Sequence, residues 1–207
     1  GVFSFYVTKN ITTAEGGMVV SRNEEFISRI KMLALHGMSL DAWQRFSDKG
    51  YKHYFVEAAG FKYNMTDLQA ALGIRQLERV DEYWKRREEI WQRYMDAFSD
   101  IPLTLPAGPS GDIRHAYHLF QLGVGPRAGL SRDEFIEGMT ERKIGVGVHY
   151  SAIPEHPYYQ RTFGWRPEDC PAATAVGRQT VSIPLSAKLT DEDVQDVISA
   201  VRDLMGA

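Results

Sequence analysis

The stretch from Phe3 to Val20 constrains the fold of this chain more than any other part of the sequence. An apolar, aromatic and β-branched run leads up to Lys9, a polar segment with two threonines follows, and a second apolar run begins at Met18. This order predicts a strand, a polar turn and a second strand, with Lys9 at the tip of the turn. The Gly16-Gly17 pair provides the backbone freedom that a sharp return requires.

Lys9 is the candidate nucleophile of this stretch. A lysine amine reacts with carbonyl groups, and a Schiff base with pyridoxal phosphate (PLP) is its commonest use with a cofactor. The apolar flanking runs would partly desolvate the amine, and hydroxyls such as that of Ser4 would reach a phosphate. The alternative is an exposed lysine in a β-turn, which composition alone favours because lysines are mostly exposed.

The residues from Ser4 to Gly17 read Ser-Phe-x-x-x-Lys-Asn-Ile-Thr-Thr-x-Glu-Gly-Gly and resemble the lysine motif of the DegT/DnrJ/StrS family. Members of that family are PLP-dependent aminotransferases that act on nucleotide-linked keto-sugars. The resemblance implies that Lys9 forms the Schiff base with PLP and that Ser4 binds the cofactor phosphate. It also implies the fold class: α/β, the C-terminal part of a fold-type I PLP-dependent transferase, with the end of the large-domain sheet and a small α/β domain that has a short antiparallel sheet.

A second match to the family runs from Gly60 to Ala71. In the family, this stretch precedes a long helix, reaches into the partner subunit's site and supplies an amide to the PLP phosphate. Asn64 stands at the amide position here and is a cofactor-binding candidate, while Lys62 is a second cation near the phosphate and a substrate-binding candidate. Which of the two touches the phosphate stays open. The Lys-Tyr-Asn version resembles the subgroup that makes 4-amino-4-deoxy-arabinose. The alternative is that Thr66 and the next residue only cap the helix.

His149 and Tyr150 form a third match, to a Gly-x-x-x-His-Tyr/Phe turn that lies near the sugar nucleotide in the family. The resemblance implies that both are substrate-binding residues, and a buried aromatic turn is the alternative. The stretch 38–62 is rich in aromatic and cationic side chains. It suits either a loop over a nucleotide or a loop that packs on the core or a dimer partner.

The periodic segments predict strands and helices in alternation. Helices are expected over 23–35, from Thr66 to about Ser99, over 131–142 and 171–178, and after Thr190; strands are expected over 116–124, 144–150 and 181–185. This order divides the chain into a remnant of the PLP-binding large domain (1–65), a long bridging helix (66–100) and a small C-terminal α/β domain (101–207).

Composition excludes several classes of function. The formal net charge of -3 over 207 residues argues against a nucleic-acid or anionic-membrane surface, and the basic run Lys85-Arg86-Arg87 is interleaved with acids and predicts a solvated face. No apolar run approaches the length of a membrane span, about 20 residues. Cys170 is the only cysteine, which suits a reducing cytoplasm, and the six histidines show no metal-ligand spacing.

The resemblance implies transfer of an amino group from glutamate to a UDP- or dTDP-linked 4-keto sugar, in a homodimer with shared active sites. The chain reaches the lysine motif within four residues of Gly1, so the resemblance predicts a partial chain without the acid that pairs with the pyridinium nitrogen. The alternative function is a non-catalytic module that dimerises or binds a nucleotide-sugar.

Overall fold

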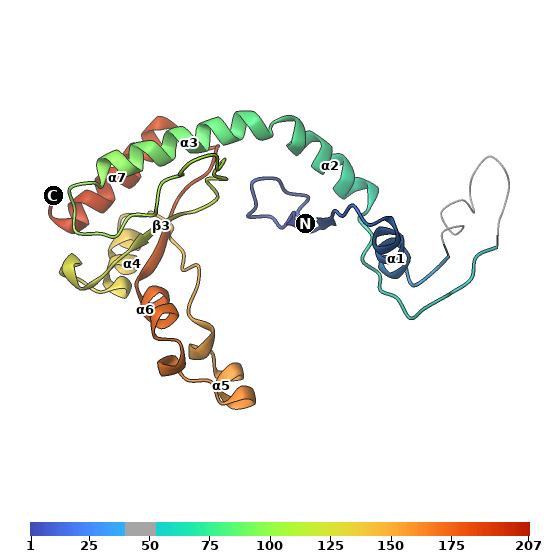
Figure 1. Cartoon of the computed structure of the whole chain (residues 1–207). Coiled ribbons are helices and arrows are strands. Elements are labelled where there is room, and N and C mark those ends of the chain that lie inside the picture. Colours follow the sequence, from blue (N-terminus) through green and yellow to red (C-terminus); the bar gives the residue numbers. More distant parts are fainter. Residues whose placement is uncertain (40–52) are drawn as a thin grey trace. The chain divides into compact units, whose positions relative to one another are not determined.

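The computed structural model describes residues 1–39 and 53–207, which form two compact units, Gly1–Val80 and Asp81–Ala207 (Figure 1). Part of the aromatic and basic stretch, including Trp43, Arg45 and Lys49, lies outside the described residues.

The first unit opens with the predicted strand, turn and strand. β1 (Val2–Ser4) pairs antiparallel with β2 (Gly17–Val19), so that Ser4 lies opposite Gly17. Gly16 has a φ of 149°, and a Cβ on Gly17 would lie 2.8 Å from the carbonyl oxygen of Phe3. The glycine pair is therefore required where the chain returns, as the sequence predicts.

Helix α1 (Glu24–Ala34) follows, within the range predicted for it, and its N-cap Asn23 accepts a hydrogen bond from the Phe26 amide at 2.9 Å. The helix is followed by His36 and Gly37, both with positive φ. The segment around Lys62 is hydrogen-bonded to the C-terminal end of this helix. The amide of Phe61 donates to the Leu33 carbonyl at 2.7 Å, and that of Tyr63 donates to the Ala34 carbonyl at 2.8 Å. These bonds fix the backbone on both sides of Lys62.

The helix predicted from Thr66 to about Ser99 is divided in the structure. α2 (Asp67–Glu78) and α3 (Val80–Ala97) are separated by Arg79, with φ −105° and ψ 1°. The Arg79 amide turns back to the carbonyls of Gln76 and Leu77, which tightens the last turn of α2. The sequence pattern misses this break because no glycine or proline marks it.

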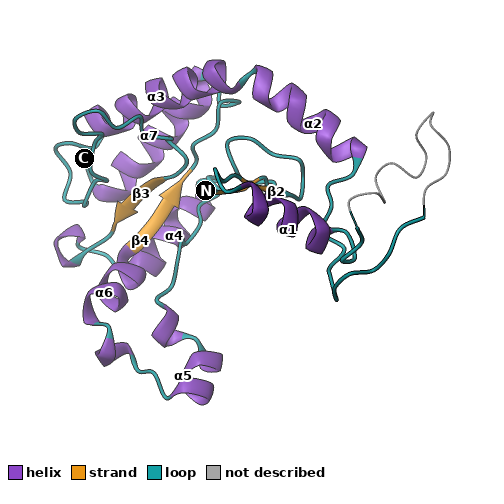
Figure 2. Cartoon of the chain, turned by 45° about the vertical axis from the view of Figure 1, so that its right-hand side comes forward, coloured by secondary structure: helices purple, strands orange, loops and turns teal. Residues whose placement is uncertain are grey.

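The second unit contains a two-stranded antiparallel sheet. β3 (Phe120–Gly123) pairs with β4 (Thr180–Ile183), with Phe120 opposite Ile183 (Figure 2). The other elements of this unit are η2 (Pro126–Ala128), α4 (Arg132–Glu141), η3 (Ile153–Glu155), α5 (Pro157–Phe163), η4 (Pro167–Asp169), α6 (Pro171–Gln179) and α7 (Asp191–Met205). The helices predicted at 131–142, at 171–178 and after Thr190 are confirmed.

The prediction of a strand over 144–150 is wrong. Only Gly147 pairs there, in an isolated bridge to Ser182. Two glycines within five residues weaken the strand propensity of this segment. The strand predicted over 116–124 is also shorter than expected, because Tyr117 has a φ of 45° and regular pairing begins at Phe120.

The core of the second unit lies between α3, α7 and the sheet, where α3 and α7 run side by side (Figure 1). Trp91, Tyr94 and Phe98 meet Phe120 through ring contacts with centroids 4.8 to 6.3 Å apart. The Tyr94 hydroxyl donates to the Pro184 carbonyl at 2.9 Å, and burial raises the pKa of this phenol. The aromatic side chains thus connect α3 to β3 and to the residue that follows β4.

The basic run on α3 is not a solvated face throughout. Lys85 is exposed and Arg86 is half-buried, but Arg87 is only 9% exposed. The prediction is wrong for Arg87, because the carbonyl groups of three distant residues satisfy its guanidinium: Tyr117, His118 and Leu185.

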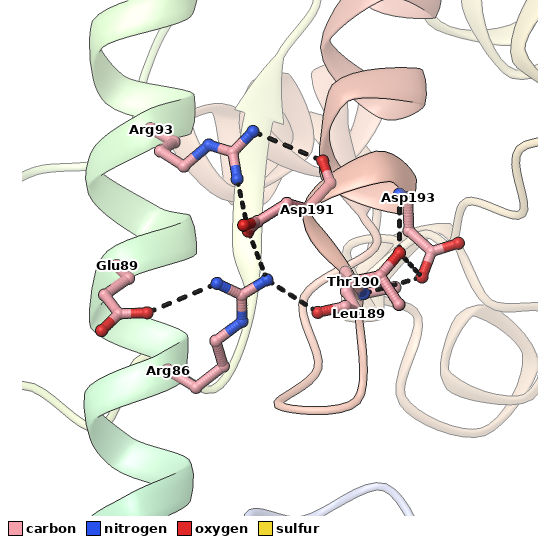
Figure 3. A network of polar contacts seen from close by, with 7 residues as sticks. All are labelled: Arg86, Glu89, Arg93, Leu189, Thr190, Asp191 and Asp193. Atoms are coloured by element: carbon pink, nitrogen blue, oxygen red, sulfur yellow. Dashed lines mark hydrogen bonds and ion pairs between the residues drawn. The ribbon is translucent and has the colours of Figure 1, made fainter.

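Arg86 and Arg93 connect α3 to the first turn of α7 (Figure 3). Both guanidinium groups lie 2.8 Å from the same oxygen of Asp191, and Arg86 also donates to the Leu189 carbonyl at 2.8 Å. Hydrogen bonding from Arg86 holds the pKa of the Asp191 carboxyl below its ordinary value. Two residues of α3 are thereby connected to the N-terminus of α7.

Candidate active site

The candidate nucleophile lies in the connection between β1 and β2, here called the lysine loop (residues 5–16). The Lys9 amide donates to the Tyr6 carbonyl at 2.9 Å, which closes a tight turn, and the Lys9 side chain is half-buried. Across the base of the loop, the Phe5 carbonyl accepts from the Thr13 amide at 3.0 Å and from the Thr12 hydroxyl at 3.1 Å. The backbone of the loop is therefore held on both sides of Lys9.

Ser4 ends β1 at the base of the same loop. Its side chain is exposed, and its hydroxyl oxygen accepts a long hydrogen bond from the Tyr6 amide at 3.4 Å. The hydroxyl proton remains available to a ligand. The structure thus places a hydroxyl at the end of β1, hydrogen-bonded to the first residue of the turn that carries the amine.

Lys62 and Asn64 are brought together immediately before α2. The ammonium group of Lys62 donates to the side-chain oxygen of Asn64 at 2.5 Å, and the Asn64 amide group lies 3.5 Å from the Met65 carbonyl. Lys62 is exposed and Asn64 is half-buried. The pair presents a cation next to an amide, both of which suit an anionic oxygen.

The lysine loop packs against α2 within the first unit. The side-chain amide of Gln69 donates to the Glu15 carbonyl at 2.9 Å, and the Thr13 side chain is only 1% exposed. Gln69 was not among the residues predicted from the sequence to contact the loop. The capping-box spacing from Thr66 to Gln69 was a usable signal for the cap itself, but nothing in the sequence indicates the contact with Glu15.

His149 and Tyr150 belong to the second unit, whose placement relative to the first is not described. The His149 ring is half-buried, its Nδ1 lies 2.9 Å from the Ser182 hydroxyl, and its carbonyl accepts from the Gln121 side chain. Tyr150 is 72% exposed, so the alternative of a buried aromatic turn is wrong for this ring. The hydrogen bond between Nδ1 and Ser182 fixes the orientation of the imidazole ring. The second ring nitrogen, Nε2, is left for a ligand.

The donor set of the first unit fits a phosphorylated aldehyde. It contains a half-buried primary amine, the hydroxyl of Ser4, and the amide and ammonium groups of Asn64 and Lys62. Among residues 1–39 and 53–207, no group of three or more histidine, cysteine or acidic side chains is placed to hold a metal ion. No helix within these ranges has the length and apolar character needed to cross a membrane.

The chain is similar to proteins of about twice its length. It is 48% identical over 205 residues to the spore coat polysaccharide biosynthesis protein SpsC of Bacillus subtilis, covering 98% of this chain and 53% of that protein. It is 43% identical over 204 residues to the uncharacterized protein MJ1066 of Methanocaldococcus jannaschii, again with 98% and 53% covered. The chain therefore spans about half the length of the curated relatives that it matches.

Solved structures agree with this similarity. PseC of Helicobacter pylori, an aminotransferase involved in pseudoaminic acid biosynthesis, matches with a TM-score of 0.86 and 29% identity, over 99% of this chain and 53% of that one. The PLP form of the putative sugar aminotransferase Spr1654 from Streptococcus pneumoniae matches with a TM-score of 0.86 and 29% identity, over 99% and 51%. These structures confirm the predicted fold class.

The model of the DegT/DnrJ/EryC1/StrS aminotransferase family matches residues 1–202, nearly the whole chain. The match spans the lysine loop, the segment before α2 and the His149-Tyr150 turn, the three stretches on which the resemblance rests. The chain belongs to the DegT/DnrJ/EryC1/StrS aminotransferase family.

Proposed function

We propose that the protein containing this chain is a PLP-dependent aminotransferase that transfers an amino group, with glutamate as donor, to a nucleotide-linked keto-sugar. The observation that carries the proposal is that Lys9 and Ser4 are both hydrogen-bonded to Tyr6, Lys9 through the turn and Ser4 from the end of β1, in a chain of this family. The similarity to SpsC, a spore coat polysaccharide biosynthesis protein, and to PseC, an aminotransferase of pseudoaminic acid biosynthesis, supports a sugar substrate.

Each candidate residue has a role in this proposal. Lys9 binds the cofactor through Nζ and, when that nitrogen is free, holds and moves a proton there. Ser4 and Asn64 donate to the cofactor phosphate, and Lys62, His149 and Tyr150 bind the substrate. Bound PLP supplies an aldehyde that condenses with primary amines, with loss of water, and a ring that withdraws electrons.

The proposal includes a homodimer with shared active sites in the cytoplasm. The segment that carries Asn64 bears two exposed, stacked rings, Phe61 and Tyr63, with centroids 4.9 Å apart. Exposed apolar rings that lie together are typical of a surface that another subunit covers, and their exposure therefore supports the dimer. The subgroup that makes 4-amino-4-deoxy-arabinose stays a prediction.

The proposal is tested by locating the cofactor on the full-length protein. PLP is added, the bond between cofactor and protein is reduced with borohydride, and the modified peptide is identified by mass spectrometry. We expect modification at Lys9 and its loss in Lys9→Arg, because the guanidinium of arginine stays protonated near neutral pH and is therefore not a nucleophile. Lys31→Arg, at the end of α1, is the matched control and should retain the modification.

Modification that persists in Lys9→Arg contradicts the assignment. Nucleotide-sugar binding by a full-length protein that takes up no PLP would instead favour the non-catalytic binding module.

A further inference from the structure

We propose that Gln69 and Gly73 are positioning residues, through which one side of α2 fixes the lysine loop and thereby the place of Lys9. The inference rests on the proposed function, because it assumes that Lys9 binds PLP. It is carried by contacts of α2 with Glu15 and Thr13, all within the first unit.

Gln69 has two roles at the start of α2. Its side-chain oxygen completes the capping box by accepting from the Thr66 amide at 2.9 Å and the Thr66 hydroxyl at 3.0 Å. Its side-chain nitrogen donates to the Glu15 carbonyl at 2.9 Å. One planar amide therefore joins the helix cap to the lysine loop.

The same chain shows that an acid is sufficient for the cap alone. The capping boxes of α4 and α7 have Glu134 and Asp193 at the position that Gln69 occupies in α2. An acid there also interacts favourably with the positive end of the helix dipole, which an amide does not. Only the amide has an N–H group to donate, so the contact with Glu15 explains the glutamine.

The Glu15 carbonyl accepts a second hydrogen bond, from the Thr13 hydroxyl at 2.6 Å. With the bond from Gln69, both lone pairs of this oxygen are occupied. The two donors come from the loop and from the helix, so the Glu15 carbonyl is the junction between them.

Gly73 allows the close approach of the loop to the helix. A Cβ at this position would lie 2.9 Å from the Cγ2 methyl of Thr13, a distance that real side chains do not tolerate without a shift. Glycine inside a helix costs about 1 kcal/mol relative to alanine. The glycine is therefore unfavourable for α2 itself, and the packing of Thr13 accounts for it.

These contacts reach Lys9 through the backbone of the loop. The Thr13 amide donates to the Phe5 carbonyl, and the Phe5 amide donates to the Gly16 carbonyl at 2.8 Å. Fixing residues 13–16 against α2 thus fixes Phe5, from which the turn with Lys9 extends. A reacting amine displaced by about 1 Å loses up to about a hundredfold in rate.

The experiment compares Gln69→Glu with Gln76→Glu in the full-length protein. Gln69→Glu keeps the acceptor for Thr66 but cannot donate to Glu15, while Gln76→Glu makes the same charge change elsewhere on α2. We expect Gln69→Glu to slow PLP attachment at Lys9 about tenfold and to reduce the visible circular dichroism of the bound cofactor. Gln76→Glu should match the parent in both, and far-ultraviolet circular dichroism should be unchanged.

A second pair of variants tests the Gly73 contact. Gly73→Ala should slow PLP attachment, because its methyl group would meet Cγ2 of Thr13. Serine at position 13 lacks Cγ2 and keeps the hydroxyl that donates to Glu15. The double variant Gly73→Ala, Thr13→Ser should therefore attach PLP at a rate within about twofold of that of Thr13→Ser alone. An effect of Gly73→Ala on α2 alone would not be reversed by removing a methyl group from the loop.

The outcomes separate the two proposals. If Lys9→Arg abolishes attachment while Gln69→Glu and Gly73→Ala keep the parent rate, the positioning role is wrong and the proposed function stands. If attachment persists in Lys9→Arg, the proposed function is wrong. Equal slowing in Gln76→Glu, or no rescue by Thr13→Ser, would also overturn the positioning role.

Discussion

Arg87 lies on α3 in contact with the core of the second unit, and its guanidinium bonds to backbone oxygens. Nη1 donates to the carbonyls of Tyr117, His118 and Leu185 at 3.1, 3.3 and 2.9 Å. Burial lowers the pKa of this guanidinium from its ordinary value. One side chain thus connects α3 to the segment before β3 and to the segment after β4.

Replacing Arg87 by methionine should destabilise the protein. Methionine retains the apolar part of the side chain but leaves buried carbonyls without a donor, so we expect the free energy of unfolding to fall by about 2 to 4 kcal/mol. Urea unfolding followed by tryptophan fluorescence measures the change. The exposed neighbour Lys85 provides the control, since Lys85→Met should change stability by less than about 0.5 kcal/mol. Equal stability of the two variants would show that the carbonyls find other partners.

The distance in sequence between partners decides which residues could be predicted. Asn23, Ser131 and Thr190 were predictable as caps because each accepts from an amide three residues later. Lys9 and Ser4 were identifiable as candidates because their motif is contiguous. Arg87 was not, since its acceptors lie 30 to 98 residues away, and the partner of Gln69 lies 54 residues away. Such contacts depend on the tertiary fold, which a local pattern does not encode.

At the scale of elements, the connection between α3 and α7 depends on Asp191. Its carboxylate forms ion pairs with Arg86 and Arg93. Hydrogen bonding from Arg86 is the largest of the effects that lower the pKa of this carboxyl below its ordinary value of 3.8. A carboxyl whose pKa is lower in the folded state than in the unfolded state stabilises the fold above its unfolded pKa. That stabilisation is lost as the pH falls through the folded pKa.

Asp191→Asn should therefore lower the thermal unfolding midpoint at pH 7 but not in strong acid. We expect the difference from the parent protein to be constant from pH 7 to about pH 5 and to shrink below pH 3.8, the ordinary value for this carboxyl. Asp196→Asn, an exposed position on the same helix, is the control and should show no such dependence. A difference that persists unchanged at pH 2.5 would contradict the role of the charge.

The two wrongly predicted elements have different physical causes. The break at Arg79 is local, because its amide turns back to the carbonyls of Gln76 and Leu77, whereas pairing in the segment 144–150 depends on a residue beyond that segment. Gly147 pairs only with Ser182, and this bridge is available because β4 presents its edge there. Periodicity predicts which face of an element is apolar, but it does not predict how many residues pair.

At the scale of the whole molecule, apolar burial is unequal between the two units. The buried core cluster, from Ile90 to Val201, lies entirely within the second unit. In the described part of the first unit, many large apolar side chains are exposed, including Val2 at 81%, Leu68 at 86% and Phe55 at 73%. Since burial of apolar surface is the main source of stability, the two units should differ in stability.

Hydrogen exchange of the 207-residue chain tests this expectation. Amides of α1 and α2 should exchange at least about tenfold faster than those in the middle of α3 and α7, because local opening of the first unit exposes little additional apolar surface. Peptide-level mass spectrometry resolves the four helices. Equal protection in all four would show that the two units unfold as one cooperative structure.

The contact between Thr13 and Gly73 also bears on how such a sequence changes over generations. Alanine at 73 and serine at 13 are each one nucleotide substitution away, and their effects depend on which comes first. A lineage that acquires alanine first passes through a form in which the new methyl group meets the threonine methyl. A lineage that acquires serine first does not. The order of the two mutations, rather than their combined effect, then decides which evolutionary path is open.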